Sequence, residues 1–159
     1  EYLASIAFKK HGIKNTIFRP FSGYGSDQDL NYPFPSIVLR AINHKSKKKF
    51  IVWGSGYQMR DFIHIKDVIR GSLLIARKIK NGKAINLSSG KLLSFISLSK
   101  KILKILGKKN IKVNGNSNKP EGVYARGGST FLQKKYGFVP KISIDQGIKW
   151  AIQYFDNKQ

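Results

Sequence analysis

The sequence IKNTIFR, residues 13–19, decides the fold class, because it has the composition of a buried β-strand. Its central Thr-Ile-Phe triplet consists of residues that favour strands and is too apolar for a strand with one face exposed to solvent. A strand covered on both faces is typical of a parallel sheet. Gly12 comes just before it and is a suitable end for a helix over residues 1–11. The stretch therefore predicts a helix followed by a buried parallel strand.

Helical and strand-like segments continue to alternate along the chain. Apolar residues recur at helical spacing in five later segments, which are 36–43, 67–80, 94–106, 130–136 and the residues from Ser143 onward. Short β-rich runs predict strands over 50–53, 60–65 and 84–87, and residues 20–35 and 114–128 have the Pro, Gly and Asn content of loops. This alternation predicts an α/β fold with a mostly parallel sheet.

The composition limits the classes of function. The chain has 159 residues with 30 Lys and Arg against 8 Asp and Glu, a net charge of +22, but only six of the basic residues are Arg. The Lys residues are spread over many predicted elements, so we expect a solvated basic surface and no specific nucleic-acid site. No apolar run reaches the roughly 20 residues of a membrane span, and the absence of Cys excludes disulfides and thiolate chemistry. The three His residues are far apart and lack nearby carboxylate pairs, so we expect no metal site.

Some short motifs match catalytic or cofactor patterns by chance. The Gly-x-Gly sequences at 23–25 and 54–56 lack a third Gly and do not lead from a buried strand directly into a helix, so we expect tight turns. Tyr154 and Lys158 have the spacing Tyr-x-x-x-Lys, but they lie at the end of the last predicted helix. We therefore assign no catalytic role to them.

Five longer motifs occur in a fixed order, which is more specific than any one of them. They are RPFSGYG (19–25), GSGYQMRDFIHIKDVIRG (54–71), INLSSG (85–90), KPEGVYAR (119–126) and GFVPKISI (137–144). Together they resemble the extended short-chain dehydrogenase/reductase family, the NAD-dependent nucleotide-sugar epimerases and dehydratases. The fourth motif is similar to the KPxGxxxR stretch of GDP-sugar epimerases and synthases.

The resemblance implies that residues 1–159 are the C-terminal portion of one such domain, an extended Rossmann fold (a doubly wound parallel sheet) with a small substrate-binding α/β subdomain. Residues 1–32 and 60–90 would contribute to the Rossmann part, and 33–59 and 91–159 would form the subdomain. The family's Gly-rich NAD loop and its catalytic Ser/Thr and Tyr-x-x-x-Lys would all lie before Glu1. The resemblance thus implies NAD as the cofactor, no catalytic residue within this chain, and no activity of the chain by itself.

Two Arg residues within the motifs are the main candidates for substrate binding. By resemblance, Arg60 and Arg126 would hold the diphosphate of a nucleotide sugar, a task suited to planar guanidinium groups that make bidentate hydrogen bonds. Surface ion pairs with Asp61 or Glu121 are the alternative for these two residues. Ser22 stands where the family usually has an Asn that contacts the diphosphate.

Further candidates flank these residues. Ile51 and Trp53 lie on either side of the position that lines the nucleotide base in relatives. For Trp53, a role in the hydrophobic core is expected as strongly as stacking on the base. Pro20 and Phe21 would lie near the nicotinamide of NAD. Asp67 is expected to cap the helix that follows it rather than to contact substrate.

The resemblance implies that the complete enzyme oxidises a sugar carbon to a transient keto intermediate, in the manner of UDP-glucose 4-epimerases or GDP-sugar epimerases. An NADPH-dependent nucleotide-sugar reductase and a non-catalytic basic binding module are the alternatives. The expected partners are a nucleotide-diphosphate sugar and, in the intact enzyme, a second copy in a homodimer. We expect a cytoplasmic protein without membrane contact, and the sugar and the base stay open.

Overall fold

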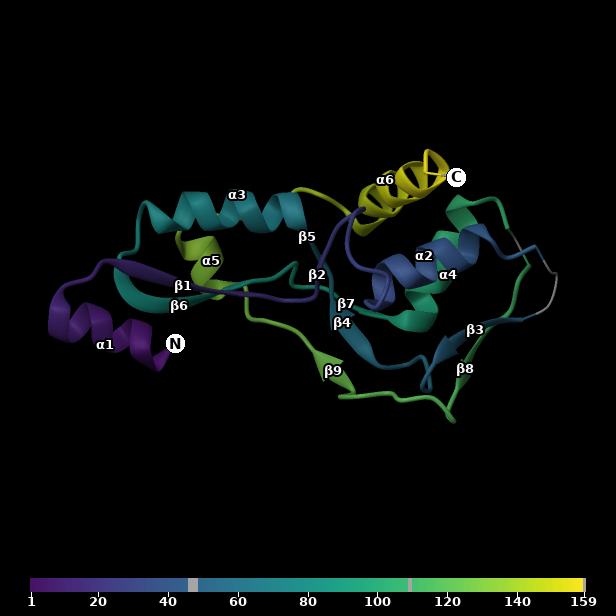
Figure 1. The fold of residues 1–159 in the computed structure, drawn as a ribbon, viewed down its shortest axis with the longest axis horizontal. Helices are drawn as coiled ribbons and strands as arrows, with labels where there is room; N and C mark the ends of the chain where they lie inside the picture. The colour runs from purple at the N-terminus through teal and green to yellow at the C-terminus, as the bar shows by residue number, and fades with distance from the viewer. Residues whose placement is uncertain (46–48, 109, 159) are drawn as a thin grey trace.

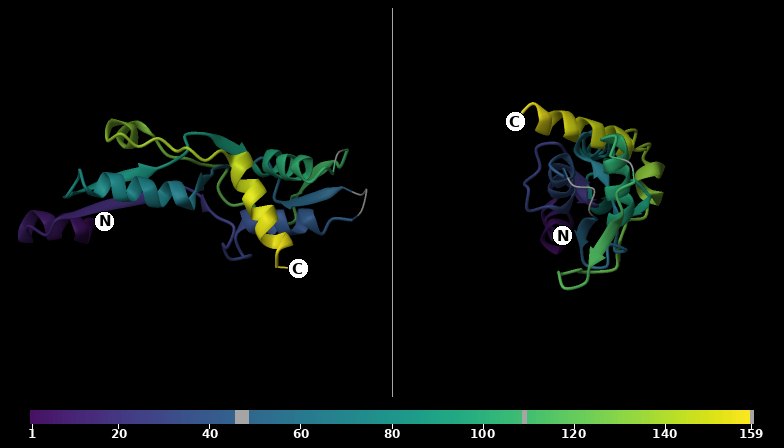
Figure 2. Two further views of the ribbon diagram at one scale, coloured as in Figure 1. Left: turned by 90° about the horizontal axis from the view of Figure 1, so that it is seen from above. Right: turned by 90° about the vertical axis from the view of Figure 1, so that its right-hand side faces the viewer.

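The computed structural model describes residues 1–45, 49–108 and 110–158. The helices are α1 (Tyr2–His11), α2 (Pro33–Ile42), α3 (Ile65–Ala76), α4 (Phe95–Ile105), α5 (Phe131–Lys135) and α6 (Ile144–Asp156). The strands are β1 (Asn15–Pro20), β2 (Gly23–Tyr24), β3 (Phe50–Trp53), β4 (Met59–Asp61), β5 (Ile63–His64), β6 (Asn81–Leu87), β7 (Leu92–Ser94), β8 (Val113–Asn116) and β9 (Ala125–Arg126). The molecule is elongated, with α1 at one end and β3 and β8 at the other, as Figures 1 and 2 show.

The first end of the molecule is built around the parallel pair β1 and β6. Helices α3 and α5 lie on one side of this pair and α1 on the other (Figure 1). The core beneath α3 contains Ile75, Ile79, Ile85, Leu87 and Phe138, all of them buried. The prediction that β1 is a buried strand is wrong: its first four residues are half-buried and its last two are exposed, although helices flank the pair, whereas the end of β6 is buried. The predicted α/β class with parallel strands is confirmed.

A second core lies at the other end, among α2, α4, α6 and the parallel pair β3–β8. It is formed by buried apolar residues that include Phe34, Val38, Leu98, Ile102 and Ile148. Each helix here contributes one apolar face, as the helical spacing in the sequence predicted.

Between the two cores, β4 joins segments that are distant in sequence. It pairs antiparallel with β7 and parallel with β9. The neighbouring pair β2–β5 is parallel and continues from β1 and β4. The middle of the molecule is therefore made of short strands that bring together the ends of several motifs.

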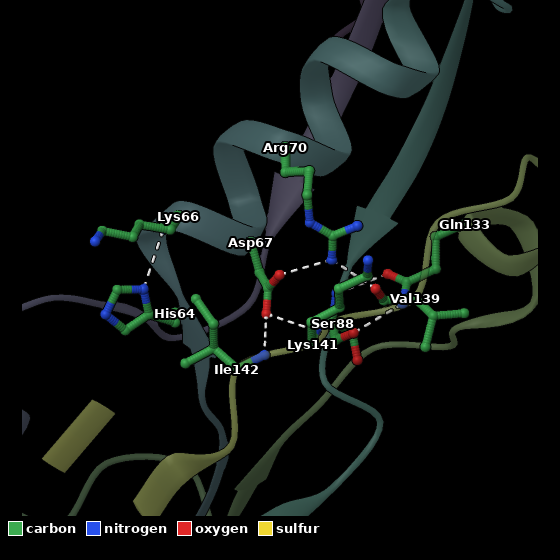
Figure 3. A network of polar contacts seen from close by, with 9 residues as sticks. All are labelled: His64, Lys66, Asp67, Arg70, Ser88, Gln133, Val139, Lys141 and Ile142. Carbon is green, nitrogen blue, oxygen red and sulfur yellow. Dashed lines mark hydrogen bonds and ion pairs between the residues drawn. The ribbon is translucent and has the colours of Figure 1, made fainter. Parts of the chain in front are cut away.

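Helix α3 begins earlier than expected, and its cap is His64. The imidazole Nδ1 accepts a hydrogen bond from the backbone N–H of Lys66 at 3.2 Å. The prediction that Asp67 caps this helix is wrong. Its buried carboxylate instead accepts hydrogen bonds from the backbone N–H groups of Lys141 and Ile142, at 2.9 and 2.8 Å (Figure 3). Asp67 therefore ties α3 to the segment that leads into α6.

Two further contacts in the same network hold the C-terminal segments on the first core (Figure 3). Gln133 is fully buried; its amide nitrogen donates to the Ser88 carbonyl at 2.8 Å, and its oxygen accepts from the Ser88 N–H at 2.9 Å. Arg70 donates to the Val139 carbonyl at 2.7 Å. The end of β6, where ligands bind in sheets of this kind, is thus fixed by α5.

The structure differs from the sequence prediction at several boundaries. Helix α2 begins at Pro33 rather than residue 36, and α3 ends at Ala76 rather than residue 80. Strands β2, β8 and β9 lie in segments predicted as loops. In the described part of the chain, no helix is both long and apolar enough to cross a membrane.

Candidate functional site

Two adjoining cavities, of about 420 and 390 Å³, form a continuous trough between the two cores. Both cavities are lined by Tyr32, Pro33, Arg60 and Phe95. The larger one extends from these residues to the end of β1, and we call it the β1 end of the trough. The other extends to Trp53 at the end of β3, and we call it the β3 end.

Arg60 and Arg126 are neighbours in the trough, where Arg60 lines both ends and Arg126 only the β1 end. They are aligned partners in the register of the parallel strands β4 and β9, and both line the cavity of the β1 end. Arg60 is held by hydrogen bonds from its Nη1 to the carbonyls of Met59 and Val123, at 2.8 and 2.9 Å, and its guanidinium lies over the Phe95 ring at 5.6 Å. Burial, and then the positive charge of Arg126, lower the pKa of Arg60. Two adjacent cations with open donors are a suitable site for an anion that carries more than one charge.

The alternative that these Arg residues form surface ion pairs is wrong for the residues that the structure describes. The Asp61 carboxylate is buried and accepts hydrogen bonds from the N–H groups of Ser89 and Gly90, at 2.8 and 3.2 Å. The Glu121 carboxylate is bound to Ser55. In the described ranges, neither acidic residue pairs with Arg60 or Arg126.

Pro20 is the last residue of β1, Phe21 and Ser22 follow it directly, and all three line the β1 end of the trough. Phe21 packs so closely on Gly128 that a Cβ at that position would come within 2.4 Å of the ring. Ser22 has a φ of +27°, a region that L-residues rarely adopt and that often marks functional sites. The β1 end thus has an aromatic wall and a strained turn beside the two Arg residues.

Trp53 and Ile51 point to the same side of β3 but do not line the same cavity. The core alternative for Trp53 is wrong, because its side chain is 59% exposed and lines the β3 end of the trough. Ile51 lines a separate cavity of about 440 Å³ together with Phe50 and Arg40. The structure therefore brings together six of the seven candidate residues and leaves Ile51 outside the trough.

The trough also contains residues that the sequence analysis did not select for binding. They are Tyr32, Phe95, Arg40 and Gln58, together with Glu121, which was considered only as an ion-pair partner. The scarcity of Arg in this Lys-rich chain was an available signal for Arg40, one of only six Arg residues. Gln58 and Glu121 lie within two of the ordered motifs, which was an available signal for them. Tyr32 and Phe95 lie in no motif that distinguishes them from core or surface residues.

Known proteins with similar sequences and structures show the family. A probable GDP-L-fucose synthase 1 of Oryza sativa subsp. japonica is 24% identical over 155 residues, which cover 91% of this chain and 47% of that protein. A dTDP-4-dehydro-6-deoxy-D-allose reductase of Streptomyces bikiniensis is 26% identical over 132 residues, 79% of this chain and 38% of that protein. The crystal structure of UDP-glucose 4-epimerase from Thermotoga maritima with UDP-glucose superposes with a TM-score of 0.84 at 25% identity, covering 99% of this chain and 50% of that one.

The chain spans about half the length of these relatives or less. The model of the NAD-dependent epimerase/dehydratase family matches residues 1–88, which is more than half of the 159 residues. The ordered motifs, the parallel α/β fold and this match agree with one another, and the chain belongs to the NAD-dependent epimerase/dehydratase family.

Proposed function

We propose that the trough binds a nucleotide-diphosphate sugar and that the complete protein is an NAD-dependent nucleotide-sugar epimerase or dehydratase. The observation that carries this proposal is the pair Arg60 and Arg126, adjacent on β4 and β9 and free of carboxylate partners among the described residues. A diphosphate between them would make charge-assisted hydrogen bonds with both guanidinium groups. It would also relieve the repulsion from Arg126, which adds to the larger effect of burial in lowering the pKa of Arg60.

The two ends of the trough suit the two ends of such a ligand. The β3 end offers an exposed indole for stacking with a base, and the β1 end would take the sugar. Pro20 and Phe21 fit the nicotinamide end of the cofactor, because they form an apolar wall at the carboxyl end of a parallel strand, where dinucleotides bind in Rossmann folds. When bound, NAD would supply hydride transfer, and the role of this chain would be to hold and orient the sugar beside it.

A nucleotide-sugar reductase that uses NADPH is the second candidate. It is favoured by the similarity to the Streptomyces bikiniensis reductase, whose 26% identity is close to that of the other relatives. Incubation of the full-length protein with a nucleotide sugar separates the two. An epimerase or dehydratase converts it without net consumption of cofactor, whereas a reductase consumes one NADPH for each keto sugar reduced.

The central test replaces Arg60 or Arg126 with Ala in the full-length protein and measures nucleotide-sugar binding by calorimetry. Each replacement removes a charge-assisted contact, so we expect each to cost about 1.5–3 kcal/mol of binding free energy. Lys in place of Arg should recover only part of this loss, because it restores the charge but not the planar fork. The double variant should lose less than the sum of the single losses, since both groups act on one diphosphate.

The control is Arg77→Ala, at the exposed C-terminal end of α3. Equal and small effects at all three Arg residues would contradict the proposed site. Tight binding of DNA with no binding of nucleotide sugars would favour the non-catalytic basic module instead.

A further inference from the structure

The β3 end of the trough contains a cation, an anion and an exposed aromatic ring whose joint role the proposed function leaves open. Arg40 reaches this cavity from α2, Trp53 from the end of β3, and Glu121 from the segment between β8 and β9. Arg40 and Glu121 line the same cavity, yet in the described part of the chain they form no ion pair with each other. The cavity of the β3 end is therefore lined by both a cationic donor and an anionic acceptor that are not paired with each other.

Arg40 is fixed in place by contacts with β3. Its Nη2 donates a hydrogen bond to the Ile51 carbonyl, and its guanidinium lies over the Phe50 ring at 5.1 Å. These contacts use one face and one nitrogen of a group that has five N–H donors. The group keeps further N–H donors beyond this bond, and Arg40 lines the β3 end of the trough as well as the cavity of Ile51. Its contacts with β3 set its position before any ligand binds.

Glu121, which lines the same cavity, is also positioned in advance. Its two carboxylate oxygens accept hydrogen bonds from the N–H and the hydroxyl of Ser55, at 3.0 and 2.5 Å. These bonds lower the pKa of Glu121, so the carboxylate is charged at neutral pH and acts only as an acceptor. Gly54 permits the close approach, because a Cβ there would come within 2.8 Å of the Glu121 Cβ. Each oxygen keeps acceptor capacity beyond the Ser55 bonds.

Among the common nucleobases, this arrangement complements guanine. The guanine edge that carries O6 and N7 accepts two hydrogen bonds, and guanidinium groups recognise it in bidentate fashion. The neighbouring edge carries the N1–H and N2–H₂ donors, which a carboxylate can accept together. The ring faces can stack on the indole of Trp53, whose ring also carries the Lys119 ammonium over it at 5.7 Å from the centroid. We propose that the β3 end of the trough is a guanine subsite read by Arg40 and Glu121, so that the nucleotide sugar is a GDP-sugar.

The other bases match this pair of residues less well. Adenine and cytosine place an exocyclic amine, a donor, where Arg40 also offers donors. Uracil and thymine have a single N–H between two carbonyl oxygens, so a carboxylate that accepts this N–H is repelled by the oxygens beside it. A site whose buried or fixed polar groups lose their partners rejects the wrong ligand strongly.

This inference rests on the proposed diphosphate site, and ligand series on the unmodified full-length protein can test it. Calorimetry would compare GDP with UDP, dTDP, CDP and ADP, and with two analogues that each lack one guanine group. IDP lacks the 2-amino group from which Glu121 would accept a hydrogen bond. 7-Deaza-GDP lacks the N7 to which Arg40 would donate one. We expect GDP to bind about ten-fold more tightly than any of the others. Equal affinities for GDP, UDP and IDP would overturn the guanine subsite.

Two variants assign the contacts to residues. In Glu121→Gln the ratio of the IDP to the GDP dissociation constant should fall toward one. In Arg40→Gln the ratio of the 7-deaza-GDP to the GDP dissociation constant should fall toward one. The matched controls are Asp156→Asn at the end of α6 and Arg77→Gln at the end of α3, both exposed, which should keep both preferences. Preferences that persist in the site variants would overturn the assignment, and thermal melting of each variant checks that it is folded.

The Arg60→Ala variant separates this inference from the function on which it rests. If it weakens all nucleoside diphosphates by a similar factor while the unmodified protein has no base preference, only the guanine subsite fails. If it weakens none of them, the proposed diphosphate site fails as well. The expected result is a uniform loss with the preference for GDP retained.

Discussion

His64 is a buried residue whose ring nitrogen has a structural role at the start of α3. It lies between the rings of Tyr24 and Trp150, with centroids at 5.1 and 5.2 Å, and its Nδ1 accepts the N–H of Lys66. Burial, and then the charge of Lys66, lower the pKa of His64 below its ordinary value of 6.5. A neutral imidazole is required here, because a protonated ring could not accept the Lys66 hydrogen bond.

This feature predicts a loss of stability in mild acid. Below about pH 6.5 the unfolded chain binds a proton at His64 that the folded chain does not bind until a lower pH is reached. The free energy of unfolding should therefore decrease as the pH falls below 6.5 toward the folded-state pKa. His64→Asn keeps a helix-capping acceptor that does not titrate, so urea unfolding should show a shallower decrease in this variant. His11→Asn, on the exposed end of α1, is the control, and identical pH slopes in all three proteins would contradict the role.

Only part of the site could be predicted from single residues. Arg60 and Arg126 could be selected because each lies in a motif on a chain that otherwise uses Lys. Their alignment on adjacent strands depends on the pairing of β4 with β9, which joins residues more than 60 positions apart. Arg40 and Glu121 could not be paired in advance, since their approach to one cavity depends on the packing of α2 against β3 and on the Ser55 turn.

At the scale of elements, α2 is capped by a residue from a distant segment. The Lys108 ammonium donates hydrogen bonds to the carbonyls of Ala41, Ile42 and His44, at 2.7, 2.6 and 2.9 Å. It thereby satisfies carbonyls at the C-terminal end of the helix and places a positive charge at the negative end of its dipole.

Lys108→Met should destabilise the protein by about 2 kcal/mol, because the apolar side chain leaves these carbonyls without their charged donor. Chemical denaturation would measure the free energy of unfolding. Lys104→Met, on the exposed side of α4, is the matched control and should change stability by less than about 0.5 kcal/mol. A loss at Lys108 no larger than at Lys104 would show that the cap contributes nothing.

The elements that the sequence mispredicted have identifiable physical causes. Pro33 and Pro35 indicated a loop, but both lie in the first turn of α2, where Pro costs no hydrogen bond. The Val-Asn-Gly-Asn sequence of β8 has low strand propensity, and it forms a strand because it pairs with β3. Gly115 is required there, since a Cβ would come within 2.2 Å of the Ser55 carbonyl oxygen. Tertiary contacts therefore decide this strand, whereas the long amphipathic helices follow from the sequence pattern.

For the whole molecule, one exposed surface predicts self-association of chain 1–159. Ile65, Ile69 and Leu73 form an apolar stripe along α3 and are 42%, 52% and 61% exposed. Among the described residues, β1 pairs with β6 on one edge only, so its other edge also offers unpaired backbone groups. Exposed apolar stripes and open strand edges promote association between copies.

We expect the average mass of this chain in sedimentation experiments to rise above 18.0 kDa with concentration, at moderate salt that screens the charge of +22. The double variant Ile69→Lys, Leu73→Lys should stay closer to the monomer mass. Phe131→Lys, which replaces an exposed apolar residue outside the stripe, is the control. If the stripe variant and the original chain associate equally, the stripe is not the cause.

The two ends of the trough share Tyr32, Pro33, Arg60 and Phe95, whereas Trp53 lines only the β3 end and Phe21 only the β1 end. If the trough holds the proposed nucleotide sugar, substitutions confined to the β3 end would alter the preferred nucleotide and leave the surroundings of the sugar unchanged. Changes confined to the β1 end would instead admit new sugars on the same nucleotide. Nucleotide preference and sugar preference could then be engineered separately, with Arg60 retained in both cases because it lines both ends.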